Sequence, residues 1–296
     1  MKVVPESEFG HGEPDARVDR LSSLLARFRI RASLFHSGAL CGNHAFEERP
    51  GRAFMHVLRR GEMEVRHLPG QAEPRLRLSR PTLLLYPRPL YHQFVNPPRD
   101  GADFTCATLD FDGGDRNPIV RSLPSLVSVP LDAIEGLGPA LDLLFAEADR
   151  VRCGSRLLAD RLFEVVLIQL LRWIIDHPAE AGVGSGLVTG LSDPRLARAL
   201  VALHDAPHES WPLERMASIA GMSRSALAAA FRAATGTTPA AYLADWRLTL
   251  AGTRLRAGAP LKVVAAELGF AGAPSLSRAF RQRMGMSPRQ WLAAPG

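Results

Sequence analysis

The sequence contains no run of about 18 apolar residues, which is the length that a membrane-spanning helix needs. Its first residues, Met1–Asp19, are polar and of mixed charge, so they lack the apolar stretch of a secretory signal. These two absences argue against a membrane partner and against secretion. We therefore expect a cytoplasmic protein.

Cysteine is scarce. Cys41, Cys106 and Cys153 are too few and too scattered to form a disulfide framework. The chain has 296 residues, of which 46% are hydrophobic and 22% are charged. Such a chain can bury a sizeable core without disulfides or metals, and its length suggests about two domains.

The net charge of +6 is unevenly distributed. Residues 190–296 hold 13 Lys and Arg against 6 Asp and Glu, whereas residues 1–189 hold 23 against 24. A basic segment of this kind is typical of a surface that neutralises a phosphate backbone. Charge alone is weak evidence, because many protein surfaces are basic without binding nucleic acid.

Short apolar segments separated by turn signals fill the region from residue 31 to residue 111. Examples are Phe54–Leu58, Met63–Arg66, Thr82–Tyr86, Gln93–Val95 and Phe104–Phe111. Gly and Pro stand between them, as in Arg60-Gly61 and Pro69-Gly70. This spacing predicts an antiparallel barrel or sandwich.

Two long, Leu-rich segments follow residue 130 and predict helices over Leu137–Val151 and Arg156–Ile175. The apolar residues of the second segment exceed a single helical stripe, so the barrel or a second subunit must cover most of its sides. A dimer contact is one of these two alternatives, since DNA-binding regulators often pair to read two half-sites. The next segment, Pro178–Gly190, is rich in Gly and predicts a flexible linker.

Five residues recur in order within the last third of the chain. Gly221, Phe231, Gly236, Pro239 and Tyr242 correspond to a second set, which lies 48 or 49 residues further on: Gly269, Phe280, Gly285, Pro288 and Trp291. A repeat of this length, with two helices and a tight turn in each copy, is typical of a duplicated supersecondary unit.

Each copy has the pattern of a helix-turn-helix. In the first, helix Leu213–Ala220 leads to Gly221, and Ser223 caps a second helix that runs to about Ala234. In the second, helix Val263–Leu268 precedes Gly269, and another helix covers about Pro274–Arg283. We expect Leu227 and Phe231, and correspondingly Leu276 and Phe280, to face the core.

The region from Leu191 to Trp291 resembles the DNA-binding module of the AraC/XylS family. The resemblance rests on residues 216–225, on Tyr242–Leu248, on Leu268-Gly269-Phe270, on Ser277–Arg281 and on Gly285–Pro288. It implies a module that places two recognition helices in adjacent segments of the major groove of double-stranded DNA.

The resemblance also implies which side chains face the bases. They are Ser225, Ala228 and Ala229 in the first recognition helix and Ala273, Pro274, Ser275 and Arg278 in the second. Of these residues, only Arg278 can donate two hydrogen bonds to the edge of a guanine base. We therefore expect Arg278 to account for much of the direct base recognition. We expect the arginines Arg224, Arg232 and Arg281 to lie at the phosphate backbone, which positions the protein without specifying sequence. We also count the cap residue Ser223 among the DNA-binding residues.

The N-terminal region resembles the cupin-type sensor of an AraC branch that includes reactive-chlorine regulators. The resemblance rests on Phe35–Gly42, on His56, on His92 and on Thr105–Leu109, and Pro87–Asn96 resembles the second cupin motif. The cupin metal motif is incomplete, because Leu58 stands at its second His position and Glu62 only has plausible spacing for its carboxylate.

Three hypotheses remain open for the polar residues of this region. Cys41, His56, His92 and Cys106 could converge on Zn²⁺ or another soft transition metal, since thiolates and imidazoles suit it. In the regulator branch that the sequence resembles, cysteines at the positions of Cys41 and Cys106 can act as redox sensors, which requires an exposed thiolate. Alternatively, both cysteines are packed core residues and both histidines have local hydrogen-bond partners.

These observations predict an α+β protein in three parts. Residues 1–130 form a cupin-like antiparallel β-barrel, residues 131–189 a helical dimerisation region and linker, and residues 190–296 an all-α domain with two helix-turn-helix units. We expect a transcription regulator and not an enzyme. This regulator should require no cofactor and form a homodimer, and its partners should be DNA, an unknown effector and RNA polymerase. The alternative is a cupin-type metalloenzyme fused to a DNA-binding domain. The sequence leaves open whether genes are activated or repressed.

Overall fold

The computed structural model describes residues 18–96, 101–150 and 152–293. The polar N-terminal segment therefore lies almost entirely outside the described residues, as does the predicted helix end at Val151. Within the described ranges, no helix is both long enough and apolar enough to cross a membrane.

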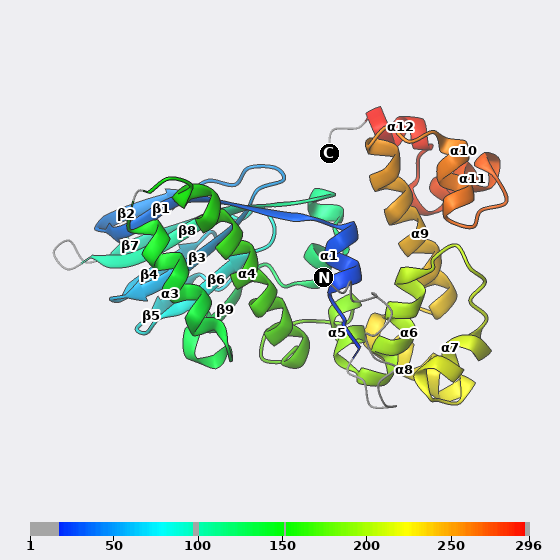
Figure 1. Cartoon of the computed structure of the whole chain (residues 1–296), viewed down its shortest axis with the longest axis horizontal. Coiled ribbons are helices and arrows are strands. Elements are labelled where there is room, and N and C mark those ends of the chain that lie inside the picture. Colours follow the sequence, from blue (N-terminus) through cyan, green and yellow to red (C-terminus); the bar gives the residue numbers. More distant parts are fainter. Residues whose placement is uncertain (1–17, 97–100, 151, 294–296) are drawn as a thin grey trace, which may run out of the picture.

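Two antiparallel sheets form the N-terminal part (Figure 1). One sheet has the strand order β1-β8-β3-β6-β9 and the other has the order β2-β7-β4-β5. The strands are β1 Ile30–Leu40, β2 Gly42–Phe46, β3 Ala53–Arg60, β4 Met63–His67, β5 Arg75–Leu78, β6 Thr82–Tyr86, β7 His92–Asn96, β8 Ala102–Phe111 and β9 Val127–Pro130. All five predicted strands are present, and the sequence pattern missed β1, β2, β5 and β9.

The side chains of β3 alternate between two apolar environments, as expected for neighbouring residues of a strand. Phe54 and Leu58 face the space between the sheets, where they join Phe94 and Phe104. Met55, in contrast, belongs to a second apolar cluster on the opposite face of the five-stranded sheet. One face of this sheet therefore lines the barrel interior, and the other face supports helices.

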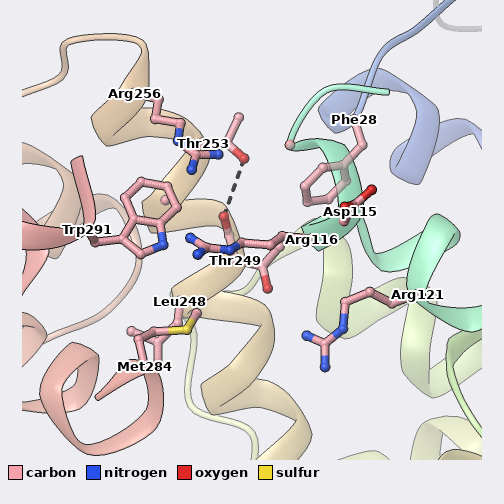
Figure 2. A pocket seen from close by; sticks show the side chains of 12 residues that line it. Phe28, Asp115, Arg116, Arg121, Leu248, Thr249, Thr253, Arg256, Met284 and Trp291 are labelled. Carbon is pink, nitrogen blue, oxygen red and sulfur yellow. Dashed lines mark hydrogen bonds between the residues drawn. The ribbon is translucent and has the colours of Figure 1, made fainter. Parts of the chain in front are cut away.

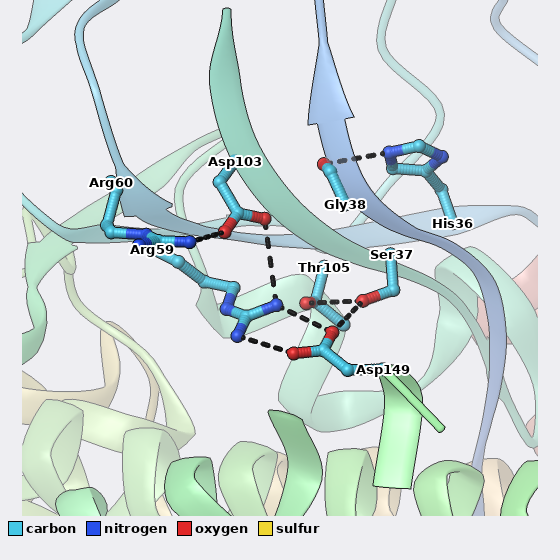
Figure 3. Close-up of polar contacts among 8 residues, drawn as sticks. All are labelled: His36, Ser37, Gly38, Arg59, Arg60, Asp103, Thr105 and Asp149. Carbon is cyan, nitrogen blue, oxygen red and sulfur yellow. Dashed lines mark hydrogen bonds and ion pairs between the residues drawn. The ribbon is translucent and has the colours of Figure 1, made fainter. Parts of the chain in front are cut away.

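Helices α3 (Leu137–Ala148) and α4 (Ser155–Asp176) pack on each other, and α4 also packs on β1. Phe163, Val166 and Leu170 of α4 are buried in this layer. The sheet and α3 thus supply most of the cover that the Leu-rich sequence of α4 requires. Figure 3 shows polar contacts that join Asp149, just after α3, to side chains of the barrel.

The segment Pro178–Gly190 is more ordered than the predicted flexible linker. Helix α5 (Leu187–Ser192) begins inside it and crosses the predicted boundary at residue 190. Leu187 and Val188 are buried, and the backbone N–H of Gly186 donates to the carbonyl of Ala234 at 2.9 Å. Glycine content alone did not reveal that these apolar residues pack against the helical domain.

The C-terminal domain is all helical, as predicted. Its helices are α6 Pro194–Asp205, α7 Leu213–Ala220, α8 Arg224–Thr235, α9 Pro239–Arg256, α10 Leu261–Glu267, α11 Ala273–Met284 and α12 Pro288–Ala293. The short helix α1 (Ser22–Arg27), near the start of the described chain, packs against α6 (Figure 1). Phe28 after α1 is fully buried and meets Trp246 of α9 edge-on, with ring centroids 5.5 Å apart. The apolar cluster behind the five-stranded sheet therefore continues into the C-terminal domain.

The sequence repeat corresponds to a repeated aromatic contact. Phe231 meets Tyr242 with ring centroids 5.4 Å apart, and the matching residues Phe280 and Trp291 meet at 5.9 Å, both pairs edge-on. All four residues predicted to face the core, which are Leu227, Phe231, Leu276 and Phe280, have exposures of 0%. The two units therefore share a packing scheme as well as a sequence pattern.

Candidate nucleic-acid interface and barrel interior

The first helix-turn-helix comprises α7 and α8. Gly221 ends α7 in the left-handed region at φ 64°, a conformation that glycine adopts without strain. Ser223 then caps α8, because its hydroxyl oxygen accepts from the N–H of Ala226 at 3.2 Å. The turn and the cap thus orient α8 as the sequence predicted.

On α8, the expected base-facing positions form a small, nearly apolar surface. Ser225 and Ala229 are exposed and Ala228 is half-buried. Arg224 is exposed but donates to Glu214 of α7 at 2.7 Å, and this hydrogen bond lowers the pKa of that carboxyl. Arg224 thus already has a carboxylate partner on the preceding helix.

The second helix-turn-helix comprises α10 and α11. The backbone at Gly269 has φ 72°, and a Cβ there would lie 2.2 Å from the carbonyl oxygen of His208. Glycine is thus required at this turn for both conformation and space. Pro274 lies in the first turn of α11, where its missing N–H costs nothing.

Arginines dominate the exposed surface of α11. Arg278 and Arg281 are exposed, and within the described ranges neither forms an ion pair. Arg283, in contrast, donates to both carboxylate oxygens of Asp245 at 2.8 and 2.9 Å. Of the other expected base-facing residues, Pro274 is exposed, and Ala273 and Ser275 are half-buried.

The two recognition helices therefore offer DNA different chemistry. Arg232 of α8 is exposed and unpaired among the described residues, but it lies towards the end of its helix. Arg278 lies in the middle of α11. A guanidinium can donate two parallel hydrogen bonds to guanine, whereas an Ala methyl can only contact thymine. Of the two helices, α11 therefore presents the unpaired arginine nearer its middle, and α8 presents mainly Ala and Ser.

His56 of β3 and His92 of β7 are buried inside the barrel, with their Nε2 atoms 2.9 Å apart. The Nδ1 atom of His92 lies 2.9 Å from the carbonyl oxygen of Leu90 and must donate to it. We therefore assign His92 Nε2 as the acceptor of the His56 Nε2–H. This leaves Nδ1 of His56 buried and without a hydrogen-bond partner in the described part of the chain.

Burial keeps this histidine pair uncharged. Desolvation lowers the pKa of His56 well below its usual range and lowers the pKa of His92 to about 3. The ring of His92 stacks between Tyr86, at 3.9 Å, and Phe46, at 4.8 Å. The interior is thus an aromatic core around two neutral imidazoles.

The four residues expected to converge on a metal or to act as redox sensors do not form one site. Cys106 is buried and pairs with His56 in the strand register, but Cys41 is exposed and follows the end of β1. Since Leu40 pairs with Ala102, Cys41 lies about 14 Å or more from Cys106 along β8, beyond the reach of a disulfide. Burial also raises the pKa of the Cys106 thiol, which disfavours the reactive thiolate.

This arrangement does not fit a zinc centre. The buried candidates are His56, His92 and Cys106, and the imidazole Nε2 atoms are engaged with each other. Glu62 is exposed in the turn after β3, and Leu58 is buried at the second His position of the cupin motif. Among the described residues, no group of three or more His, Cys, Asp or Glu could hold a metal ion.

The geometry defines a cupin-like barrel joined to a double helix-turn-helix domain. A cupin family model matches residues 19–176 and a helix-turn-helix domain model matches residues 216–294. The chain therefore belongs to the AraC-type transcriptional regulators with an N-terminal cupin domain.

Individual relatives agree with this assignment. A putative AraC-like transcription regulator of Streptomyces antibioticus is 37% identical over 180 residues, which are 60% of this chain and 59% of that protein. The RCS-specific HTH-type transcriptional activator RclR of Escherichia coli is 28% identical over 215 residues, 71% of this chain and 74% of RclR. This chain thus spans about three-fifths of the Streptomyces relative.

Among solved structures, an AraC-type transcriptional regulator of Chromobacterium violaceum is 27% identical. The match covers 36% of this chain and 97% of that chain, with a TM-score of 0.33.

Proposed function

We propose that the protein regulates transcription by sequence-specific binding to double-stranded DNA. Helices α8 and α11 enter successive segments of the major groove, and Arg278 is the principal base-reading residue. The observation that supports this proposal is the exposed guanidinium of Arg278, which has no ion pair in the described ranges. Arg224, Arg232 and Arg281 bind phosphates, and Ser225, Ala228 and Ala229 let α8 approach the groove closely.

In this proposal the two units contribute differently to binding. The first unit positions the protein on the duplex through backbone contacts and groove shape, which carry little direct sequence information. The second unit reads bases through Arg278 and through apolar contacts of Ala273 and Pro274. Specificity is therefore concentrated in one half of the binding site.

Footprinting of the full chain on genomic DNA fragments tests the proposal. We expect two protected segments about one helical turn apart. The logarithm of the DNA-binding constant falls linearly with the logarithm of the salt concentration. Arg232→Ala and Arg281→Ala should each reduce the magnitude of this slope by about 1, because one phosphate contact is lost. Arg75→Ala, which removes an exposed charge from β5, is the control. Protection of a single segment, or equal salt slopes in all variants, would contradict it.

We further propose that the barrel part senses an effector and that the protein acts as a homodimer. An effector can control DNA binding only if its affinity differs between two states of the protein. Leu157, Leu158 and Val165 of α4 support the dimer, because they are 41 to 62% exposed on one helical face. Such an apolar surface next to the barrel can pair with the same surface of a second copy.

A further inference from the structure

A loop of the first helix-turn-helix unit lies against the turn of the second unit. The loop, residues 206–212, connects α6 with α7. Within it, the backbone of His208 approaches Gly269 so closely that a Cβ on this glycine would lie 2.2 Å from the carbonyl oxygen of His208 and 3.0 Å from its Cα. His208 also lines one pocket with Glu267 and Leu268, which precede the turn. The two units are therefore in contact away from α9, the helix that connects them.

Arg247 of α9 holds this loop through the loop's backbone. Its Nε donates to the carbonyl of Pro207 at 2.6 Å, and its Nη2 donates to the carbonyl of Glu209 at 2.9 Å. The guanidinium is half-buried, forms no ion pair within the described ranges, and lies 6.0 Å from the ring centre of Phe270 in the second turn. A lysine ammonium lacks the planar fork of donors that reaches both carbonyls, so the contact requires arginine.

The loop is also fastened to α7 of the first unit. Arg215 of α7 donates to the carbonyl of Ser210 at 3.0 Å and to the carboxylate of Glu209. Its guanidinium lies 4.1 Å from the ring centre of Trp211, and the indole N–H of Trp211 donates to the carbonyl of Ala206 at 2.9 Å. The loop is therefore a compact segment that moves with α7.

The second unit is fastened to α9 itself. Arg283 of α11 donates to both carboxylate oxygens of Asp245 in α9, at 2.8 and 2.9 Å. The ring of Trp291 in α12 lies against Gly252 of α9, where a Cβ would come within 2.9 Å of the ring. Figure 2 shows Trp291 and Met284, the last residue of α11, next to α9. The second unit therefore moves with α9.

The first unit is attached to α9 at two points. Phe231 of α8 meets Tyr242 near the start of α9, with ring centroids 5.4 Å apart. Arg247, which binds the loop, lies about 7.5 Å further along the helix axis. With only the first attachment, the first unit could pivot about the start of α9. The second attachment fixes the angle between the unit and the helix.

We propose that Arg247 is a positioning residue that fixes the separation of the two recognition helices and so selects the spacing between the two halves of the operator. The inference rests on the proposed function, because it concerns how α8 and α11 share one binding site. Successive major-groove segments lie one helical turn apart, which is about 10 base pairs. An added base pair moves the second segment by about 3.4 Å and turns it about the axis. A rigidly joined pair of helices cannot follow this change.

Binding titrations of the full chain test the proposal on the footprinted operator and on duplexes with one base pair added or removed between its halves. The parent chain should bind the altered duplexes about tenfold more weakly than the operator. Arg247→Gln should reduce this preference to about threefold or less, and Arg247→Lys should give an intermediate preference. Arg195→Gln, which removes an exposed charge from α6, should keep the full preference. Weaker binding of all duplexes by one factor in Arg247→Gln would overturn the proposal.

Distances between spin labels on α7 and α10 test the same coupling without DNA. The labels are attached at Ser218→Cys and Ala266→Cys, both exposed, in a full chain whose exposed Cys41 and Cys153 are replaced by Ser. The distance distribution should be narrow with Arg247 present and broad in Arg247→Gln, or in Arg247→Lys if the first variant does not fold. Equal widths would overturn the proposal. A chain that binds no duplex of any spacing would contradict the proposed function, whereas the label distances would still test the role of Arg247.

Discussion

Both Nη atoms of Arg59 in β3 donate to the carboxylate of Asp149, at 2.8 and 2.9 Å. Ser37 of β1 donates to the same carboxylate at 3.2 Å (Figure 3). The guanidinium of Arg59 also lies 4.2 Å from the ring centre of Phe145 in α3. The hydrogen bonds from Arg59 lower the pKa of Asp149. These contacts join the end of α3 to two strands of the barrel.

Asp149→Asn should destabilise the protein only slightly. The side chain of Asp149 is 45% exposed, and such ion pairs contribute less than about 1 kcal/mol. We expect a small loss in the free energy of unfolding in urea, accompanied by faster hydrogen exchange at the end of α3. Asp110→Asn, which affects a looser pair with Arg31 at 3.7 Å, is the matched control. Identical exchange at the end of α3 in both variants would argue against a joining role for Asp149.

The buried histidines should make the protein unstable in mild acid. Burial lowers the pKa of His92 and His204 to about 3 and that of His56 well below its usual value. The unfolded chain, with a pKa near 6.5, therefore binds more protons, and stability falls as pH decreases below about 6.5. Each such histidine should cost about 2 kcal/mol of stability between pH 7 and pH 5.

Unfolding measured across this pH range tests the effect. On unfolding near pH 5, the double variant His56→Phe/His92→Phe should take up about two fewer protons than the parent protein does. His208→Gln, at an exposed histidine, should leave the pH dependence unchanged. If the double variant loses stability with pH as steeply as the parent protein, the two imidazoles are not the neutral buried groups described here.

Phe280→Ala should disrupt the second helix-turn-helix more than the first. Phe280 is fully buried against Trp291, and loss of a buried Phe costs about 3–5 kcal/mol. Hydrogen exchange should accelerate most in α10 and α11, whereas Phe231→Ala should affect α7 and α8. A uniform increase across both units in each variant would show that the two units unfold together.

A charge on the exposed face of α4 should dissociate the proposed homodimer. Leu157 and Val165 are 62% and 42% exposed, and a buried carboxylate between two copies would be unpaired. In sedimentation experiments, Leu157→Glu and Val165→Glu should sediment as monomers at concentrations where the parent chain is dimeric. Leu68→Glu, at a residue 46% exposed in the barrel part, should remain dimeric. A parent chain that is monomeric would remove this part of the proposal.

The elements with strong local signals could be predicted from the sequence. Gly221, Ser223 and the Leu and Phe residues at helical spacing define the helix-turn-helix units, because turn, cap and core positions lie within a few residues of one another. Five strands were evident from apolar segments between Gly and Pro. Strand β1 was not, since its side chains are mostly half-exposed and its register shifts between Leu34 and His36.

Contacts between distant segments could not be predicted. The strand order places Cys106 beside His56 but leaves Cys41 beyond the end of β1, and this order is not evident from the motifs. Similarly, Arg116 and Arg256 are far apart in sequence, and both lie near the ring of Trp291 only because α9 and α12 pack near the N-terminal part. The linker prediction failed because glycine content gave no information about the burial of Leu187.

Binding titrations of the full chain on an operator duplex and on a scrambled duplex, at one salt concentration, test most directly whether Arg278 reads a base. Arg278→Ala should cost about 1–3 kcal/mol on the operator, a loss of about 5- to 150-fold, and leave the scrambled site nearly unchanged. Arg232→Ala should weaken both duplexes by a similar factor. Operator affinity that is unchanged in Arg278→Ala, or reduced equally on both duplexes, would contradict the account.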